Sequence, residues 1–342
     1  MEQARAAIMT AEVVLVLETI LKLFLVILTG AVLRNRQLFD EHSTERLSRF
    51  AVDVAFPALV FTSMLRTIEP QVLAGSWYLP LLGIGMLLLG IVIAWLSVPL
   101  LGISGHPRRG SAALAAATPN WLFIPLPIAT ALYGAQGERI VLLVNVGVLL
   151  VFWSVGVLIV RGGKLDRAAL RNLLLNPGLV ATLIGIGVAV AFPAARTLEE
   201  VDVVEAGPLE ALVSVVVKAL AFVGDTTVPL AMLVTGSFLA GAGMRGASNP
   251  QVLGVSAIRL LALPAIAMLL LRLASVAELP IETAVSTTLV IISAAPVAVT
   301  CSILAKKYRG DTTMLSRTIF VSTMVSAATV PAIVWATQRL GL

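Results

Sequence analysis

The chain has 342 residues, of which 58% are hydrophobic and 13% are charged, and its net charge at pH 7 is +5. Ordinary soluble domains contain about a quarter of charged residues, so this composition excludes them and predicts a multi-pass membrane protein. Cys301 is the single cysteine, which excludes an intrachain disulfide. His42 and His106 lie far apart in the sequence, so we expect no Cys/His metal cluster.

Ten apolar segments follow one another along the chain, each close to the roughly 20 residues that a helix needs to cross a bilayer. The longest connection between them, 194–210, is too short for a soluble domain. We therefore predict an all-α membrane protein with ten transmembrane helices, without a cofactor and without enzyme activity. The segments are 11–33, 45–65, 76–101, 111–133, 138–160, 174–193, 211–239, 251–275, 281–305 and 314–338.

Basic residues gather in alternate connections, which the positive-inside rule places in the cytoplasm with both termini outside. They are Arg34, Arg36, Arg46, Arg49, Arg108, Arg109, Arg161, Lys164, Arg167, Arg171, Arg245, Lys306, Lys307, Arg309 and Arg317. The opposite side contains an acidic run between Glu199 and Glu210. This distribution accounts for the net charge without nucleic acid, and we expect a protein of the cell membrane, such as a bacterial inner membrane.

The second and seventh segments each contain an aspartate, Asp53 and Asp225, with a basic residue seven positions before it and a proline four positions after it. Carboxylates inside a membrane often belong to proton or cation paths. The alternative is a structural role, in which Asp53 is neutralised by Arg49 and Asp225 by Thr226 or Thr227. The sequence leaves ion coupling and structure open at both positions.

The fourth segment contains Pro119, Asn120, Pro125 and Pro127 near its middle, and the ninth contains Pro296. A proline inside a helix removes an N–H donor and crowds the carbonyl four residues earlier. Backbone groups freed in this way are tolerated in a membrane only where protein or a wet cavity surrounds them. We therefore expect both helices to be broken near the middle of the bilayer.

Two similarities relate the halves of the chain. The aspartates of the second and seventh segments are 172 residues apart, and similar motifs beginning at Ile128 and Ile303 close the fourth and ninth segments 175 residues apart. We predict two five-helix repeats, 11–161 and 174–338. An odd number of helices gives the two copies opposite orientations in the membrane, which is typical of transporters.

The helix breaks are the predicted substrate site, because the N-terminus of a half-helix favours an anionic or hydrogen-bonding ligand. Simple kinks and interhelical hydrogen bonds are the alternative interpretation of the same residues. We expect Arg259 near the inner end of the eighth segment, reaching the interface or lining an exit path. The candidate substrate-binding residues are Pro119, Asn120, Asn145, Pro296 and Thr300.

Several short motifs resemble the auxin efflux carrier family, which includes the plant PIN proteins and bacterial malate permease-like proteins. They are Pro119-Asn120, Ile124-Pro125-Leu126, Leu132-Tyr133-Gly134, Ala295-Pro296 and the run 304–311, with supporting matches at Phe56-Pro57, Asn176-Pro177 and Pro229-Leu230. The first Asn of the plant Asn-Pro-Asn motif is replaced by Thr118, which joins the candidate substrate-binding residues. The long loop of the plant proteins is reduced here to about 161–172, and both differences argue against auxin as the substrate.

The resemblance implies the fold of bile acid sodium symporters, in which the broken fourth and ninth helices cross. It further implies a scaffold of helices 1, 2, 6 and 7 that forms a homodimer in the bilayer, and a moving domain of helices 3–5 and 8–10. The expected function is elevator-type transport of small organic anions.

Three other functions remain open at this stage. One is a sodium- or proton-coupled symporter of the bile acid type, and another is a membrane sensor that binds a small ligand without transporting it. An intramembrane aspartyl protease needs a Gly-x-Gly-Asp motif, but the sequence here is Phe222-Val223-Gly224-Asp225, so the first glycine is absent. No nucleotide-binding Gly-x-x-x-x-Gly-Lys-Ser/Thr loop is present, which argues against direct coupling to ATP.

Overall fold

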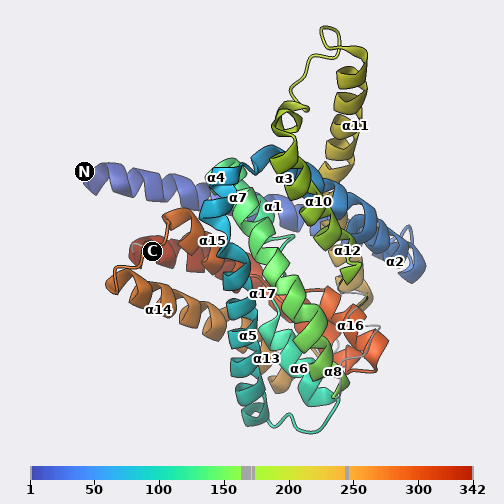
Figure 1. The fold of residues 1–342 in the computed structure, drawn as a ribbon. Helices are drawn as coiled ribbons and strands as arrows, with labels where there is room; N and C mark the ends of the chain where they lie inside the picture. The colour runs from blue at the N-terminus through green and yellow to red at the C-terminus, as the bar shows by residue number, and fades with distance from the viewer. Residues whose placement is uncertain (1, 163–170, 172–173, 243–245, 341–342) are drawn as a thin grey trace.

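A computed structural model describes residues 2–162, 171, 174–242 and 246–340, and this part of the chain is helical with no strand (Figure 1). Lys164, Arg167 and Arg245, which were assigned to the cytoplasmic side, lie outside the described residues. The all-helical class predicted from the sequence is confirmed.

Two long helical segments, joined by residues 36–40, begin the chain. Helix α1 spans Glu2–Asn35, and α2 spans Glu41–Phe50 and begins where the Asp40 side chain accepts a hydrogen bond from the Ser43 N–H (2.6 Å). A π-helical turn at Ala51–Ala55 leads without a break into α3, Phe56–Thr67. Pro57 is the second residue of α3, and its ring explains the wider turn because it crowds the carbonyl of Asp53, four residues earlier.

Helices α4 (Pro70–Ser76) and α5 (Leu79–Ser97) come next, and α5 ends in a 3₁₀ turn at Val98–Leu101. Helix α6 spans Arg108–Ala117, and α7 spans Pro125–Val151 with a non-helical residue, Gly134, at a kink. At this kink Gly134 has φ 56° and ψ −139°, a backbone conformation that residues other than glycine rarely adopt. A π turn at Phe152–Gly156 joins α7 to α8, Val157–Arg161.

In the second half, α10 (Pro177–Ala191) begins at Asn176, whose side chain accepts from the Leu179 N–H. A 3₁₀ turn at Pro193–Thr197 follows it, and the chain then forms α11 (Pro208–Asp225) and α12 (Thr227–Ala242). Helix α13 (Pro250–Ala257), a π turn (Ile258–Ala262) and α14 (Leu263–Val276) form one continuous helix. The last helices are α15 (Thr283–Ala294), α16 (Thr300–Tyr308) and α17 (Thr312–Leu340).

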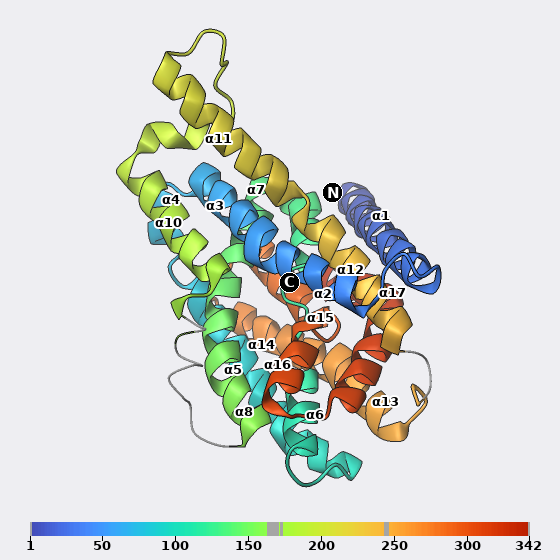
Figure 2. The same ribbon diagram turned by 90° about the vertical axis from the view of Figure 1, so that its right-hand side faces the viewer.

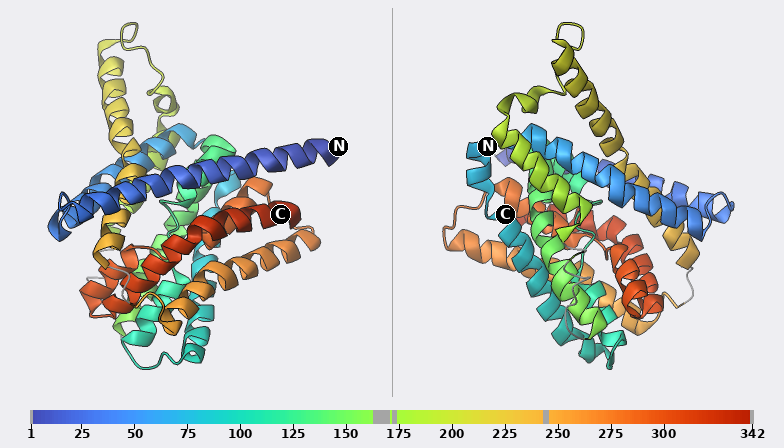
Figure 3. Two further views of the ribbon diagram at one scale, coloured as in Figure 1. Left: turned by 180° about the vertical axis from the view of Figure 1, so that it is seen from behind. Right: turned by 45° about the vertical axis from the view of Figure 1, so that its right-hand side comes forward.

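The helices fall into two groups by their contacts. In the first group, α1 packs on α12, and α3 packs on α10 and α11. In the second, α7 packs on α5 and α15, and α17 packs on α13 and α15. Contacts of α1 with α7 and α17, and of α3 with α7, join the groups. Figure 3 shows α1 and α17 side by side, and Figures 1 and 2 show α11 projecting from the rest of the molecule.

Glycine permits the close approach of α1 and α12. A Cβ added to Gly236 of α12 would meet the backbone carbonyl of Ile27, and one added to Gly30 of α1 would meet that of Leu233. Small residues at a helix contact are typical of membrane proteins, in which dispersion contacts replace the hydrophobic effect between helices. The close contact between α1 and α12 therefore depends on glycine at these two positions.

Seven helices in the described residues are long and apolar enough to cross a membrane. They are Ala11–Asn35, Glu41–Thr67, Pro70–Leu101, Pro125–Arg161, Pro208–Ala242, Pro250–Val276 and Thr312–Leu340, and the shorter apolar helices Pro177–Ala191 and Thr283–Ala294 accompany them. The number is below the ten predicted segments for three reasons. Segment four is interrupted and its second half joins segment five at the Gly134 kink of α7, segment nine is interrupted, and the helix of segment six, Pro177–Ala191, is short. The chain is a multi-pass membrane protein by length and composition.

Candidate functional site

The two proline-containing breaks lie against each other. Helix α6 ends at Ala117 and α7 begins at Pro125, while α15 ends at Ala294 and α16 begins at Thr300. Between them, Pro119 and Val297 form an antiparallel bridge. The Asn120 N–H donates to the Pro296 carbonyl (2.6 Å), and the Ala298 N–H donates to the Thr118 carbonyl (3.2 Å). We refer to segments 118–124 and 295–299 together as the crossover.

The sequence explains why each helix stops where it does. A proline disfavours helical dihedrals in the residue before it. Thr118, which precedes Pro119, has φ −98° and ψ 103°, and Ala295, which precedes Pro296, has φ −63° and ψ 147°. Both residues are extended, so each chain leaves its helix at the same place relative to its proline. The Thr118 and Pro296 carbonyls each accept a hydrogen bond from the other break, as a membrane interior requires.

A cavity of about 110 Å³, which we call the crossover cavity, lies on one side of the crossover. Its polar side chains include three of the predicted site residues, Asn120, Asn145 and Thr300, together with Asn176 and Thr235. Thr118, Pro119 and Pro296 do not line it, and they instead form the bridge behind it. Aromatic side chains complete the wall, namely Phe56, Trp121, Phe123, Phe152 and Trp153.

Two polar atoms at this cavity have no hydrogen-bond partner. Asn145 is only 3% exposed, and its Oδ1 is unpartnered, as is the Thr300 Oγ1. Asn120 is more constrained, because its Oδ1 accepts from the Phe123 N–H at 3.3 Å. A buried polar atom without a partner costs about 1–3 kcal/mol, so a ligand with polar groups would bind here favourably.

The electrostatic potential in the crossover cavity comes from the N-terminal ends of two helices. Its lining includes residues 120–123, which lead into the N-terminus of α7, and residues 298–300, where α16 begins. No acidic or basic side chain is among the residues that line it. Because a helix N-terminus has a partial positive charge of about one half, the cavity is suited to an anion.

Arg259 lies on the opposite side of the crossover and is 2% exposed. Its Nη1 donates to the carbonyls of Ala117 (2.9 Å) and Ala116 (3.4 Å), and its Nη2 donates to the Ser293 carbonyl. These carbonyls belong to the last turns of α6 and α15. One guanidinium therefore binds the C-terminal ends of both half-helices.

This position corrects the sequence prediction for Arg259. The residue lies within the continuous helix formed by α13 and α14, in the π turn before Pro264, and is buried rather than near a membrane interface. Snorkelling was the wrong expectation because α6 and α15 offer carbonyl acceptors inside the protein. The available signal was a lone arginine in an apolar segment, since such a charge needs an internal partner.

A second cavity, of about 360 Å³, lies between α5 and α14 on the Arg259 side. Leucines and other apolar residues form most of its wall, and the side chains of Arg259 and Ser293 form its polar part. The crossover therefore separates an apolar cavity that contains a cation from a cavity with several amide and hydroxyl side chains and no charged ones.

Asp53 and Asp225 are both exposed, and neither lines the crossover cavity. Neutralisation by Arg49 and by the adjacent threonines, which the sequence left open as an alternative, is not observed at either aspartate. Arg49 pairs with Glu45 (2.8 Å), and the Thr226 hydroxyl donates to the Val223 carbonyl (2.6 Å). An i,i+4 carboxylate was available to Arg49 on the N-terminal side, which is the more favourable order for such a pair on a helix.

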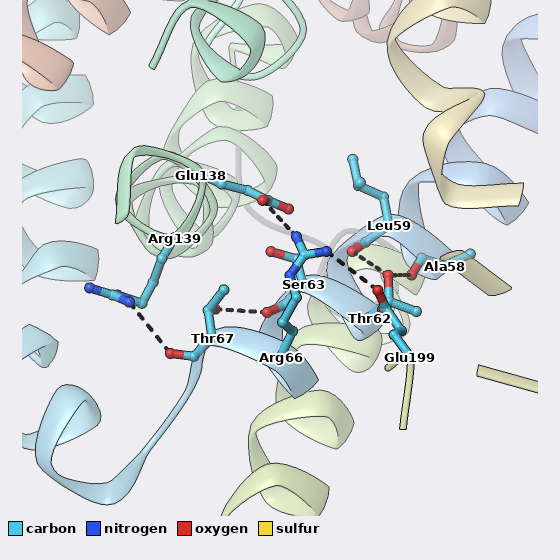
Figure 4. Close-up of polar contacts among 9 residues, drawn as sticks. All are labelled: Ala58, Leu59, Thr62, Ser63, Arg66, Thr67, Glu138, Arg139 and Glu199. Carbon is cyan, nitrogen blue, oxygen red and sulfur yellow. Dashed lines mark hydrogen bonds and ion pairs between the residues drawn. The ribbon is translucent and has the colours of Figure 1, made fainter. Parts of the chain in front are cut away.

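A polar cluster missed by the sequence analysis joins α3 to α7 (Figure 4). Arg66 of α3 pairs with Glu138 of α7 (2.9 Å) and with Glu199 (3.4 Å). Next to it, Arg139 Nη1 donates to the Thr67 carbonyl (3.4 Å). Glu138 is 7% exposed, so its ion pair is largely shielded from solvent. The charge of Glu138 at the start of a predicted segment was the one signal for this cluster.

The remaining chemistry of the site is limited. In the part of the chain that the structure describes, no group of three or more His, Cys, Asp or Glu side chains could hold a metal ion. Cys301 is fully buried beside the crossover. The arrangement therefore offers hydrogen bonds and helix ends rather than a nucleophile or a metal centre.

Comparison with known proteins gives a consistent result. The model of the membrane transport protein family matches residues 15–169 and 163–334, which is nearly the whole chain. A protein of Methanothermobacter thermautotrophicus, named as an uncharacterized transporter, is 29% identical over 174 residues. That similarity covers 49% of this chain and 56% of the relative, so the chain matches about half of the relative's length.

Proposed function

Since this chain belongs to the membrane transport protein family, we propose that it is a secondary transporter that carries small organic anions, in particular carboxylates, across the cell membrane. The resemblance to auxin efflux carriers noted from the sequence is confirmed by the family match. A transporter activity agrees with both comparisons, and the substrate class and mechanism are our proposal.

One observation supports the substrate class above all. The crossover cavity combines two helix N-termini with the unpartnered Asn145 Oδ1 and Thr300 Oγ1, and no acidic side chain lines it. A carboxylate would accept hydrogen bonds from the helix ends, the Thr300 hydroxyl and the Asn120 amide. The Asn145 Oδ1 can only accept, so it would bind a donor of the ligand, such as the hydroxyl of a hydroxy acid. At about 10–15 Å³ for each water-sized position, the cavity has room for roughly eight non-hydrogen atoms, which suits a short-chain acid.

The mechanism that we propose is elevator-type alternating access. One side of the cavity is formed by Ser48, Val52 and Phe56 with Ala231 and Thr235 of α12, and the other by α7, α16 and the crossover. These two sides belong to the two helix groups that the contacts define. The group of α1 to α3 with α10 to α12 would be the scaffold, and the remaining helices would carry the substrate across.

The proposed architecture is ten transmembrane helices in two inverted repeats, 11–161 and 174–338, with both termini outside. The paired breaks at Pro119 and Pro296 support it, because they place equivalent parts of the two halves together. We also propose a homodimer through the scaffold. This assembly is what the resemblance to the family implies.

Uptake into proteoliposomes tests the proposal. The purified protein should accumulate a radiolabelled short-chain hydroxy acid such as L-lactate, and an imposed sodium or proton gradient should reveal whether transport is coupled. Asn145→Leu should abolish most of the uptake while the protein remains folded. Binding without uptake would favour the membrane sensor, and absence of both for a panel of mono- and dicarboxylates would overturn the proposal.

A further inference from the structure

We propose that Arg259 sets the charge selectivity of the crossover cavity without contacting the substrate, so that the site takes an anion with a single negative charge. The inference rests on the proposed function and adds a positioning residue and a narrower substrate class. It starts from the contacts of Arg259, which are backbone carbonyls only: Ala116 and Ala117 of α6, and Ser293 of α15.

The partners of Arg259 define its electrostatic role. Among the described residues it has no carboxylate partner, although it is buried. A buried cation is otherwise stabilised by an acidic side chain. Here that function falls to the carbonyls at two helix C-termini, each of which has a partial negative charge of about one half. Two such ends have together about one negative charge, which one guanidinium balances.

The opposite face of the crossover has no such balance. The N-termini of α7 and α16 meet the crossover cavity, and each has a partial positive charge of about one half. No charged side chain lines this cavity. The N-terminal ends therefore present about one positive charge in total, which matches one carboxylate. A second negative charge in the same small cavity would be buried without a partner, which is strongly unfavourable.

Arg259 makes this selectivity possible. Without its charge, the C-terminal ends of α6 and α15 would place about one negative charge on the other side of the same short crossover, and this would offset the attraction of the N-terminal ends. Ala117, which Arg259 binds, is only three residues before Asn120, which lines the cavity. The residue therefore acts on an anion through the two half-helices that it holds together.

The test compares probes that differ in charge. Binding of L-lactate, the neutral lactamide and the dianionic L-malate would be measured by isothermal titration calorimetry on the purified full-length protein at pH 7.5. For the unmutated protein we expect L-lactate to bind at least tenfold more tightly than either of the others. Tighter binding of L-malate or of lactamide would overturn the inference without any variant, and would leave anion or small-ligand transport as such intact.

Variants then assign the selectivity to Arg259. Arg259→Gln should reduce the preference for L-lactate over lactamide by at least tenfold, and Arg259→Lys, which keeps the charge, should retain most of it. Arg272→Gln is the matched control, because Arg272 is exposed on α14. An unchanged preference in a folded Arg259→Gln protein would overturn the role of Arg259. If none of the three probes binds the unmutated protein, both this inference and the proposed anion site fail.

Discussion

The two faces of the crossover are built from the same two chain segments, but they differ in how their helix ends are paired. On one face, the helix C-termini are bound by Arg259, a cation that belongs to the protein. On the other, the helix N-termini and the Asn145 and Thr300 oxygens have no charged partner, and a cavity lies in front of them. In the proposed function, the first face is structural and the second binds the ligand.

Replacing the resident cation should have the largest effect. Arg259→Met leaves the carbonyls of Ala116, Ala117 and Ser293 without their donor, which should lower the stability of the protein by about 3 kcal/mol. A thermal unfolding series in detergent would measure this as a lower melting temperature. Arg272→Met is the control and should change little. Equal melting temperatures for the two variants would mean that Arg259 does not hold the crossover together.

A change on the cavity face should do the reverse. Asn145→Leu removes an oxygen that has no partner, so stability should stay the same or rise slightly. Binding of L-lactate, whose hydroxyl would donate to this oxygen, should weaken by about 2 kcal/mol. Calorimetry and a melting curve on the same sample would separate the two effects. A strong loss of stability would indicate that Asn145 is a packing residue, as the alternative interpretation of the sequence has it.

The third prediction concerns the contact of the two helix groups. Glu138→Gln breaks the charge pair with Arg66, which joins α3 to α7. Arg66 is partly exposed, so the loss of stability should be no more than about 1 kcal/mol. In the proposed mechanism this pair must open during transport, and the uptake rate should therefore change by several fold with unaltered affinity. A variant that changes affinity alone would place the cluster outside the transport motion.

The smallest effects are expected at the two aspartates. Asp53→Asn and Asp225→Asn should leave the affinity and the pH dependence of uptake unchanged, because both side chains are exposed and neither lines the crossover cavity. Both quantities would be measured by uptake into proteoliposomes at pH values from about 5.5 to about 8.5. A loss of pH dependence in either variant would establish an ion path through these residues.

Local rules predicted much of the crossover. Pro119 and Pro296 disfavour helix in the residues before them, and these two positions are where the helices end. Asn120, Asn145 and Thr300 are far apart in the sequence, and they line one cavity, as the residues of a common binding site must. By contrast, Thr118, Pro119 and Pro296 form the bridge rather than the wall. Which side of an extended segment faces a cavity depends on its pairing, and a single sequence does not contain that information.

The partners of charged residues were harder to predict. Arg259 binds helix ends that come from 142 and 34 residues away in the chain, and Arg66 binds Glu138 at a separation of 72 residues. Local spacing rules cover only i,i+3 and i,i+4 pairs. Even there, Arg49 had two candidate carboxylates, Glu45 and Asp53, and it pairs with Glu45. Long-range partners follow from the packing of helices, which periodicity does not specify.

The central claim is that an anion binds on the N-terminal face of the crossover, and a single-cysteine experiment tests it most directly. Thr300 lines the crossover cavity, whereas the neighbouring Cys301 is fully buried. Thr300→Cys in a Cys301→Ser background would place one thiol in the cavity, and its labelling by a small methanethiosulfonate reagent would be followed with and without saturating L-lactate. The account predicts that L-lactate slows labelling at least fivefold and that lactamide does not. Labelling that is unaffected by L-lactate, under conditions in which calorimetry detects its binding, would contradict the account.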